Sequence, residues 1–291
     1  MRYLYLFLLL IVIVSCHAQP TMPINKDANT LLWQVSGNGL AKPSYLFGTF
    51  HIMCKSDIVF SEHFKNALSA SAQVYFEMDI SDPKNTLGAI FFMNMQTGTL
   101  KELYTAEEYR RVSVFFKDTL SMSLDYMQKW KPMMLEALIY PSLIPCKNAS
   151  GVDMEILTLA KAQNKPIKGL ETIEFQMSVF DSIPYQIQAK SLLKTIDSIE
   201  TYRGFFTKMV TIYKKQQVNK IMELIADTAY AAAMDNDVML KNRNENWVLQ
   251  LKKIILTTNI FLAVGAAHLF GKDGLIALLR KQGYTVQPIV N

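Results

Sequence analysis

Hydrophobic positions follow two different spacings along this chain. Short apolar runs, typical of strands, occur at residues 31–35, 42–49, 74–78, 166–171, 260–264 and 284–288. Apolar residues recur at helical spacing in 58–72, 152–163 and 274–282, and through most of 85–144 and 185–256, with interruptions predicted near 203–204 and 235–237. The turn residues 36–39 separate the first two strands, which indicates an opening hairpin.

The order of these elements predicts the fold class. Strands alternate with helices at both ends of the chain, while the middle is helical. We therefore predict an α/β fold with a mixed, mostly parallel central sheet, flanking helices and a large helical insertion in the middle. With 291 residues, 50% of them hydrophobic, the chain can bury one large core. We predict a single domain over residues 31–291.

The N-terminus has the pattern of an export signal. Arg2 precedes an unbroken apolar stretch at residues 3–14, which has the length of a signal-peptide core and is too short to span a bilayer. Cleavage at a lipobox would leave a lipidated Cys16, whereas the small residues at 16 and 18 also fit ordinary cleavage before Gln19. We favour the lipoprotein. Either way, we expect a leader at 1–20, a linker at 21–30 and a periplasmic or cell-envelope location, with a lipid anchor in the membrane.

Charge and cysteine content narrow the possible partners. The net charge of +5 is spread along the chain without a basic block, so no nucleic-acid partner is expected. Beyond the leader the cysteines are Cys54 and Cys146, and a disulfide is the first expectation in an oxidising compartment. Two alternatives stay open. Cys54 lies close after His51 and could bind a metal, or both thiols could be unbonded.

Four polar residues are predicted at the carboxyl ends of strands. Two of the four histidines, His51 and His268, follow an apolar run and a GxxH turn, and Glu77 and Glu171 close two further strands. Because ligands collect beyond the carboxyl ends of parallel strands, we expect these side chains to meet at one site. Each also has a structural explanation, as a hydrogen-bonded histidine or, for Glu171, as a helix N-cap.

The residue types favour metal chemistry without identifying the metal. Imidazoles and carboxylates together can bind Zn²⁺, Mn²⁺, Fe²⁺ or Co²⁺, and no HExxH motif is present. Arg243 lies in a polar helical stretch, either as part of a solvated face or as a clamp for a substrate carboxylate or developing oxyanion. Gln176 is either an ordinary helix residue or a second substrate-binding group.

Taken together, these motifs resemble the TraB/GumN family, whose relatives include the animal TIKI proteins. The matching segments are 32–37, 43–51, Glu77 with Asp79, 169–172 with Gln176, 242–244, 264–269 and 274–286. The resemblance extends from about Leu31 to Pro288 and is weakest at 190–235.

The resemblance implies an α/β fold whose active centre contains the two GxxH histidines and a glutamate. TIKI proteins are divalent-metal-dependent proteases. The resemblance therefore implies hydrolysis outside the cytoplasm as the activity that family members share. Carried over to this chain, the centre is formed by His51, His268 and Glu77. The supporting polar residues are Glu171, Gln176 and Arg243.

The resulting hypothesis is an exported, metal-dependent peptidase acting on a peptide or protein substrate. His51, His268, Glu77 and Glu171 are the predicted ligands of Mn²⁺, Co²⁺ or Zn²⁺, which would activate water. Glu77 is the first choice for general base, and Arg243 would bind the substrate or the oxyanion. The alternatives are a non-catalytic peptide-binding protein and a metal-free esterase, by analogy with the erythromycin esterases that distant relatives resemble.

Overall fold

A computed structural model describes residues 29–226 and 237–290. The predicted leader, the candidate lipidation residue Cys16 and nearly all of the linker lie outside these residues. Within the described ranges, none of the helices has both the length and the apolar character needed to cross a bilayer.

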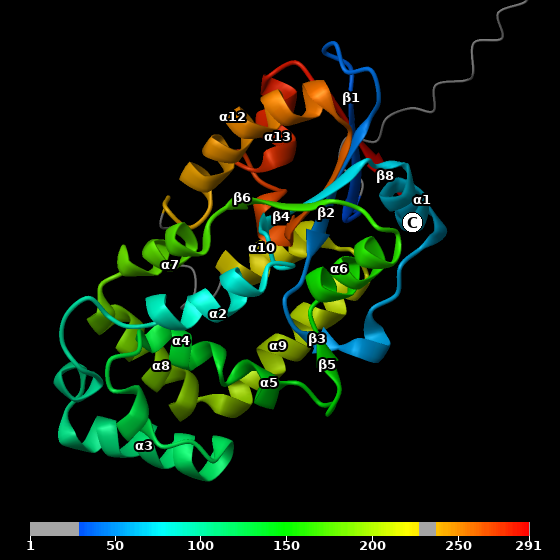
Figure 1. Cartoon of the computed structure of the whole chain (residues 1–291). Helices are drawn as coiled ribbons and strands as arrows, with labels where there is room; N and C mark the ends of the chain where they lie inside the picture. The colour runs from blue at the N-terminus through cyan, green and yellow to red at the C-terminus, as the bar shows by residue number, and fades with distance from the viewer. Residues whose placement is uncertain (1–28, 227–236, 291) are drawn as a thin grey trace, which may run out of the picture.

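A six-stranded sheet forms the centre of the fold, with strand order β6-β4-β7-β2-β1-β8 (Figure 1). Its strands are β1 (Leu32–Ser36), β2 (Ser44–Thr49), β4 (Gln73–Met78), β6 (Ile167–Glu171), β7 (Ile260–Gly265) and β8 (Thr285–Ile289). β6, β4, β7 and β2 are parallel, while β1 is antiparallel to both of its neighbours. The predicted α/β class, with a mixed, mostly parallel sheet, is therefore confirmed.

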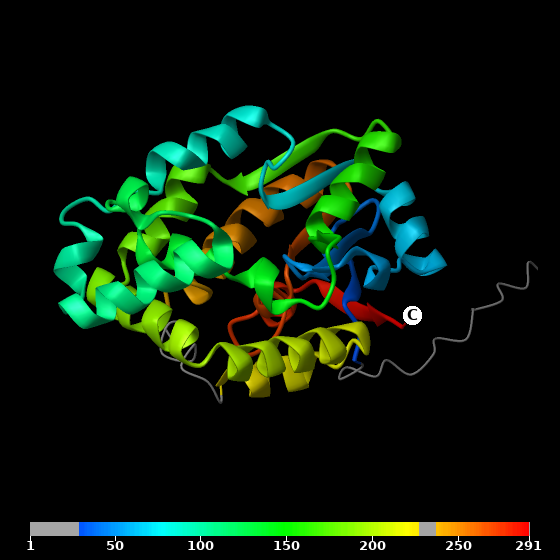
Figure 2. The same ribbon diagram turned by 90° about the horizontal axis from the view of Figure 1, so that it is seen from below.

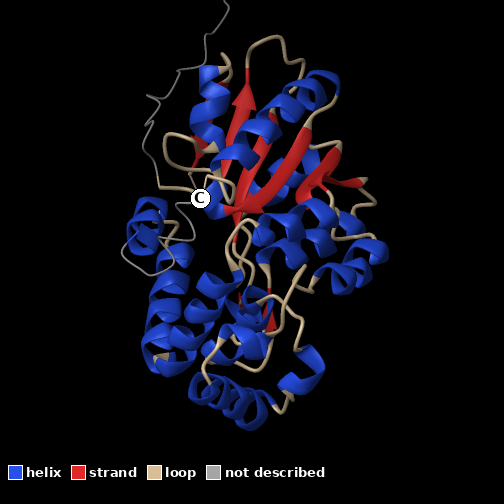
Figure 3. Ribbon diagram, turned by 90° about the vertical axis from the view of Figure 1, so that its left-hand side faces the viewer, coloured by secondary structure: helices blue, strands red, loops and turns tan. Residues whose placement is uncertain are grey.

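Helices cover both faces of this sheet (Figure 3). One face packs on α12 (Lys241–Thr257) and α13 (Leu275–Lys281). The other packs on α1 (Glu62–Ala70), α6 (Val152–Ala162), the end of α9 (Ile199–Lys214) and α10 (Val218–Ala226). Successive strand residues serve opposite faces: Leu46 packs with the α12 side and Phe47 with the α1 side.

The helical middle of the chain forms a lobe with its own core (Figure 2). The helices of this region are α2 (Pro83–Phe92), α3 (Ala106–Leu120), α4 (Pro132–Ala137), α5 (Tyr140–Leu143), α7 (Ile173–Asp181) and α8 (Tyr185–Asp197). The 3₁₀ turns of the lobe are η2 (Leu100–Leu103) and η3 (Leu124–Met127). Two others lie near the central sheet: η1 (Lys55–Asp57) in the segment after β2, and η4 (Ala266–His268) directly after β7. Phe116, Leu135 and Leu192 are buried at the centre of the lobe.

The interruption predicted near 203–204 is wrong, because α9 continues through Gly204. A single glycine costs a helix only about 1 kcal/mol relative to alanine, and the apolar spacing on either side maintains it. The chain instead breaks at Ser198 and after Lys214, where Gln216 has a positive φ of 54°.

A second, two-stranded sheet was not predicted from the pattern of apolar residues. β3 (Met53–Cys54) pairs antiparallel with β5 (Ala149–Ser150), joining the chain just after β2 to the chain just before α6. Cys54 and Cys146 form a disulfide beside this ladder, with their Cα atoms 5.9 Å apart. Neither thiol is therefore available to a metal.

Candidate active site

The predicted strand-end residues meet around Gly265, the last residue of β7. A Cβ placed on Gly265 would stand 3.3 Å from Glu77 Oε1, 3.6 Å from His51 Nε2 and 3.7 Å from His268 Cδ2. Three groups from separate parts of the chain thus surround one point. Because Gly265 has no side chain at that point, nothing of its own separates the three groups.

Glu77, in β4, is held as a carboxylate. Its Oε1 accepts a hydrogen bond from the Gly265 amide at 2.8 Å, and its Oε2 accepts one from Arg243 Nη2 at 2.7 Å. Burial opposes ionisation, but the neighbouring His268, the Arg243 guanidinium and the Gly265 amide outweigh it and lower the pKa of Glu77 to about 2. Since His268 is itself neutral near pH 7, the positive groups beside Glu77 at that pH are Arg243 and His51. A carboxylate of such low pKa suits a metal ligand better than a general base.

His268, in η4, has a defined tautomer. Asn244 Nδ2 donates to the Asp273 carbonyl at 2.8 Å, which orients the amide so that Oδ1 faces His268 Nδ1 at 2.7 Å. Nδ1 therefore carries the proton, and Nε2 keeps its lone pair. Burial lowers the pKa of His268 to about 4, so the ring is neutral at pH 7. Nε2 faces Glu77 Oε1 at 3.8 Å, as a metal-binding imidazole would.

Arg243, in α12, lies inside the site and is only 8% exposed. It donates to Glu77, to Glu171 from both Nε and Nη2, and to the Met239 carbonyl, and its Nη1 lies 3.3 Å from His268 Nε2. These contacts engage all five N–H groups of the guanidinium, so this arrangement leaves none for the predicted substrate clamp. Arg243 belongs to no solvated face; it joins the acidic residues to His268.

Glu171, at the end of β6, is the most enclosed carboxylate of the site, with a side chain 2% exposed. Oε1 accepts hydrogen bonds from Arg243 Nε at 3.0 Å and from the indole N–H of Trp247 at 2.8 Å, and Oε2 accepts one from Arg243 Nη2 at 2.7 Å. Gln176, in α7, donates to Oε2 of both Glu171 and Glu77, at 3.3 and 3.4 Å. Both residues therefore support the site, whereas we predicted Glu171 as a metal ligand and Gln176 as a substrate-binding group.

His51 forms the outer side of the site. Its side chain is 68% exposed, and Nδ1 lies 3.3 Å from Oδ2 of Asp153, in the first turn of α6. Desolvation lowers the pKa of His51, but the hydrogen bond and charge of Asp153, together with the charge of Glu77, outweigh it and raise the pKa to about 9.

Sequence reasoning missed Asp153, Asn244 and Trp247. Asp153 sits among the acidic residues of a first helical turn, where such residues are common. Asn244 follows Arg243 directly and lies in the segment 242–244 that matches the family. This position in the sequence could have identified it as a site residue. Trp247 has the spacing of a core residue, and only its indole N–H makes it part of the site.

The ligand types fit a divalent metal at three of the four predicted positions. His268 presents an unprotonated nitrogen, Glu77 a carboxylate and His51 an accessible imidazole at the same point. Glu171 differs from Glu77 in its enclosure, because its side chain is 2% exposed against 16% for Glu77. Over residues 29–226 and 237–290, no cluster of three or more His, Cys, Asp or Glu side chains forms a ready-made metal site.

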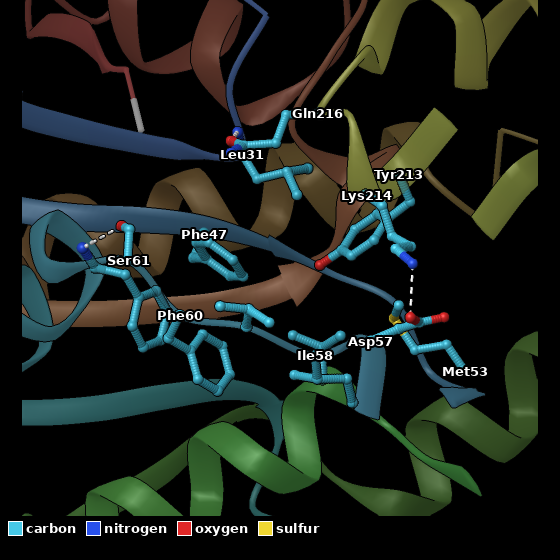
Figure 4. Close-up of a pocket in the computed structure, with 13 residues that line it drawn as sticks. Leu31, Phe47, Met53, Asp57, Ile58, Phe60, Ser61, Tyr213, Lys214 and Gln216 are labelled. Carbon is cyan, nitrogen blue, oxygen red and sulfur yellow. Dashed lines mark hydrogen bonds and ion pairs between the residues drawn. The ribbon is translucent and has the colours of Figure 1, made fainter. Parts of the chain in front are cut away.

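A separate cavity of about 230 Å³ lies on the α1 side of the sheet (Figure 4). Its walls include Phe47, Phe60 and Tyr213, with the ion pair between Lys214 Nζ and Asp57 Oδ1 at 2.6 Å on one side. None of the predicted site residues lines this cavity. The polar cluster around Gly265 is therefore the candidate for chemistry.

The fold and the site define an α/β protein with a histidine and carboxylate cluster at the carboxyl edge of its parallel strands. The chain belongs to the TraB/PrgY/gumN family, whose model matches residues 31–288. The predicted family is thereby confirmed.

Among curated proteins, the chain is similar to several named metalloproteases. It is 23% identical over 326 residues to "Metalloprotease TIKI2" of Danio rerio, covering 90% of this chain and 61% of that protein. It is 23% identical to "Metalloprotease TIKI1" of Homo sapiens, covering 91% and 63%. The chain spans about three-fifths of the length of these relatives. No solved structure matches.

Proposed function

We propose that this protein is a metal-dependent peptidase whose centre is formed by His51, His268 and Glu77. The convergence of the three groups on the point above Gly265 carries the proposal. The similarity to named metalloproteases supports the peptide or protein class of substrate. His51, His268 and Glu77 would hold the metal, and a divalent ion supplies the Lewis acidity that makes water nucleophilic at neutral pH.

The protein's own residues prepare the site in this proposal. Asn244 keeps the proton of His268 on Nδ1, so Nε2 keeps its lone pair, and a cation there would replace the contact that Arg243 Nη1 makes to Nε2 at 3.3 Å. Arg243 keeps Glu77 ionised and holds Glu171 beside it. Because its N–H groups are engaged, Arg243 acts as a positioning residue. We propose this role in place of the predicted substrate clamp.

The location is part of the same proposal. We propose export to the periplasm or cell envelope, with a lipid anchor on Cys16, on the basis of the N-terminal sequence pattern alone. Mass spectrometry of the protein from membrane and soluble fractions tests this point. A mature N-terminus at Cys16 carrying acyl chains is expected, whereas an unmodified N-terminus at Gln19 contradicts the anchor.

One observation favours a second candidate, a metal-free hydrolase. The pair of His51 and Asp153 resembles the histidine and carboxylate of nucleophile-activating centres, in which the carboxylate orients the imidazole base. In that case His51 would take the proton of an attacking water, no metal would be required, and activity would rise toward alkaline pH as the ring loses its own proton.

Chelation separates the two candidates. The purified mature protein is incubated with peptide libraries and with Mn²⁺, Co²⁺ or Zn²⁺, and cleavage is followed by mass spectrometry with and without chelator. The metal-dependent proposal expects cleavage that chelator abolishes and the metal restores. Cleavage that survives complete chelation supports the metal-free hydrolase instead.

Variants assign the residues. His51→Ala, His268→Ala and Glu77→Gln are each expected to lower kcat/KM by at least about 100-fold, while His63→Ala serves as the matched control. His63 lies in α1, is exposed and belongs to no part of the site. A wild-type protein that is inert toward all peptides with all three metals contradicts the peptidase. Peptide binding that survives in the two histidine variants then indicates a binding protein.

A further inference from the structure

We propose that Asp153 is a positioning residue for His51, fixing the imidazole so that Nε2 faces the centre of the site. Asp153 Oδ2 lies 3.3 Å from His51 Nδ1, while Nε2 of the same ring lies on the Gly265 side. The two ring nitrogens thus have separate roles, one toward the carboxylate and one toward the point shared with Glu77. This inference deepens the proposed function and rests on it for any effect on catalysis.

The β3 and β5 ladder explains why these two residues meet. Met53 pairs with Ser150 in antiparallel register, and the Val152 amide donates to the Phe50 carbonyl at 2.9 Å. Continuing the register past Met53 brings His51 opposite Val152, next to Asp153. The residue that orients His51 is therefore supplied by backbone pairing, although the two lie far apart in sequence.

Gly151 allows the close approach of the two strands. A Cβ at this position would lie 2.6 Å from the His51 carbonyl oxygen and would also collide with Oδ1 of Asp153. Any side chain at residue 151 would push the carboxylate and the backbone of His51 apart. The run Gly151-Val152-Asp153 thus has a function beyond starting α6: the glycine makes space, and the aspartate orients the ring.

The surroundings of Asp153 favour a negative charge beside His51, although the described structure gives its buried Oδ1 no hydrogen-bond partner. Asp153 is in the first turn of α6, where the backbone N–H groups and the helix dipole favour a negative charge. Below it, the disulfide between Cys54 and Cys146 and the bond from the Lys55 amide to the Asn148 carbonyl at 3.0 Å fasten β3 to β5. His51 is exposed, so this support replaces the packing that a buried histidine would have.

The expected consequence is control of the tautomer. A carboxylate at Nδ1 keeps the proton there in the neutral ring, so that Nε2 presents its lone pair. A free histidine ring prefers its proton on Nε2. Without Asp153, His51 would therefore favour the tautomer that cannot bind a cation from the Gly265 side.

Nitrogen NMR of the imidazole tests this without any metal. Full-length mature protein labelled with ¹⁵N at histidine is measured at alkaline pH, where the ring of His51 is neutral. The wild type is expected to carry the proton on Nδ1. In Asp153→Ala it should move mainly to Nε2, and Gly151→Ala should reproduce this change while keeping the carboxylate.

Glu155→Gln is the matched control, because Glu155 lies in the same turn of α6 as Asp153. Its carboxylate pairs with Lys55 Nζ at 3.0 Å and does not contact His51. It should leave the His51 spectrum unchanged. The proposal is overturned if Asp153→Ala keeps the wild-type tautomer, or if Glu155→Gln changes it as much. Circular dichroism confirms that each variant is folded, and Asp153→Leu, which has a similar size and no acceptor, replaces Asp153→Ala with the same expected result if the alanine variant does not fold.

Activity is measured separately. If the wild type cleaves peptides, Asp153→Ala should lower kcat about 10- to 100-fold, with KM little changed. An inert wild type with the expected tautomer change contradicts the proposed function but leaves the positioning role standing. Full activity of Asp153→Ala overturns the positioning role even where hydrolysis is established.

Discussion

The two halves of the candidate site are built in opposite ways. The inner half consists of Glu77, Glu171, Arg243, Trp247 and His268, which are largely buried and joined through hydrogen bonds of Arg243 and Glu171. The outer half consists of His51 and Asp153, with an exposed ring held by one contact of 3.3 Å. The inner half thus fixes the charges of the site, while the outer half lies where a ligand can reach it.

This contrast explains the opposite behaviour of two similar GxxH histidines. The pKa of His268 falls to about 4 because the ring is buried, whereas the pKa of His51 rises to about 9 beside Asp153. Sequence pattern alone makes the two equivalent, and their surroundings make them different. The expected results below use that difference, beginning with the largest effect.

Removing the cation of the inner half should be the most damaging change. Arg243→Met leaves Glu77 and Glu171 as buried carboxylates without a counter-charge, and breaking such a pair costs about 3–5 kcal/mol. Urea denaturation measures the free energy of unfolding. The loss should shrink at acidic pH, where protonated carboxylates need no cation. A loss of stability below about 1 kcal/mol would mean that Glu77 and Glu171 do not depend on Arg243 for their counter-charge.

Removing the disulfide should affect the outer half most. The double change Cys54→Ala and Cys146→Ala is expected to cost about 2–4 kcal/mol, since the bond closes a long loop in the unfolded chain. Hydrogen exchange should accelerate at residues 50–54 and 149–153 and stay slow at 260–265. Equal acceleration at both places would show that the two halves share one support.

The pH dependence of stability should differ in sign between the histidines. Because the folded pKa of His268 lies near 4, below its ordinary 6.5, the unfolded chain binds the proton first and stability falls from pH 6.5 toward 4. His51 has a raised pKa, so its contribution is complete below 6.5 and is lost as pH rises through about 9. Solvent screens this exposed ring and makes its effect smaller.

Unfolding measured across pH 4 to 10 tests this pair of signs. His268→Gln should flatten the acidic side and His51→Gln the alkaline side. Glu77 contributes to the acidic loss only below its ordinary 4.5, because its folded pKa is about 2. The assignment is wrong if His268→Gln changes only the alkaline side.

The smallest effect is expected at the ion pair beside the outer half. Lys55 Nζ lies 3.0 Å from Glu155 Oε1, with the lysine half exposed. Exposed pairs of this kind contribute up to about 1 kcal/mol, so Lys55→Met should change stability by less than that. A thermal unfolding curve is sufficient. A larger loss would place Lys55 among the supports of His51.

The strand pattern was sufficient to predict the fold and the identity of the central residues. Glycine before histidine, after an apolar run, is a local signal, and parallel strands bring their ends together. This reasoning located His51, Glu77, Glu171 and His268. It could not separate ligands from supports, because that depends on partners such as Trp247, whose indole N–H occupies Glu171.

The residues that were missed, and the role of Arg243, depend on contacts between distant parts of the chain. β3 and β5 contain two residues each, which is too short for any period to appear. Asp153 takes its role from that ladder, and Arg243 takes its role from two carboxylates on other strands. Local patterns predict elements well, but the partner of a buried charge is known only once the elements are placed.

The position of β7 has a consequence for the timing of assembly. This strand follows β2 and β4 in the sequence by more than 180 residues, yet it lies between them and pairs with both. A nascent polypeptide that has not yet left the ribosome up to residue 265 has neither a continuous sheet nor the floor on which His51 and Glu77 meet. Any chemistry of this cluster must therefore wait until β7 and His268 have been made and the strand has entered the sheet.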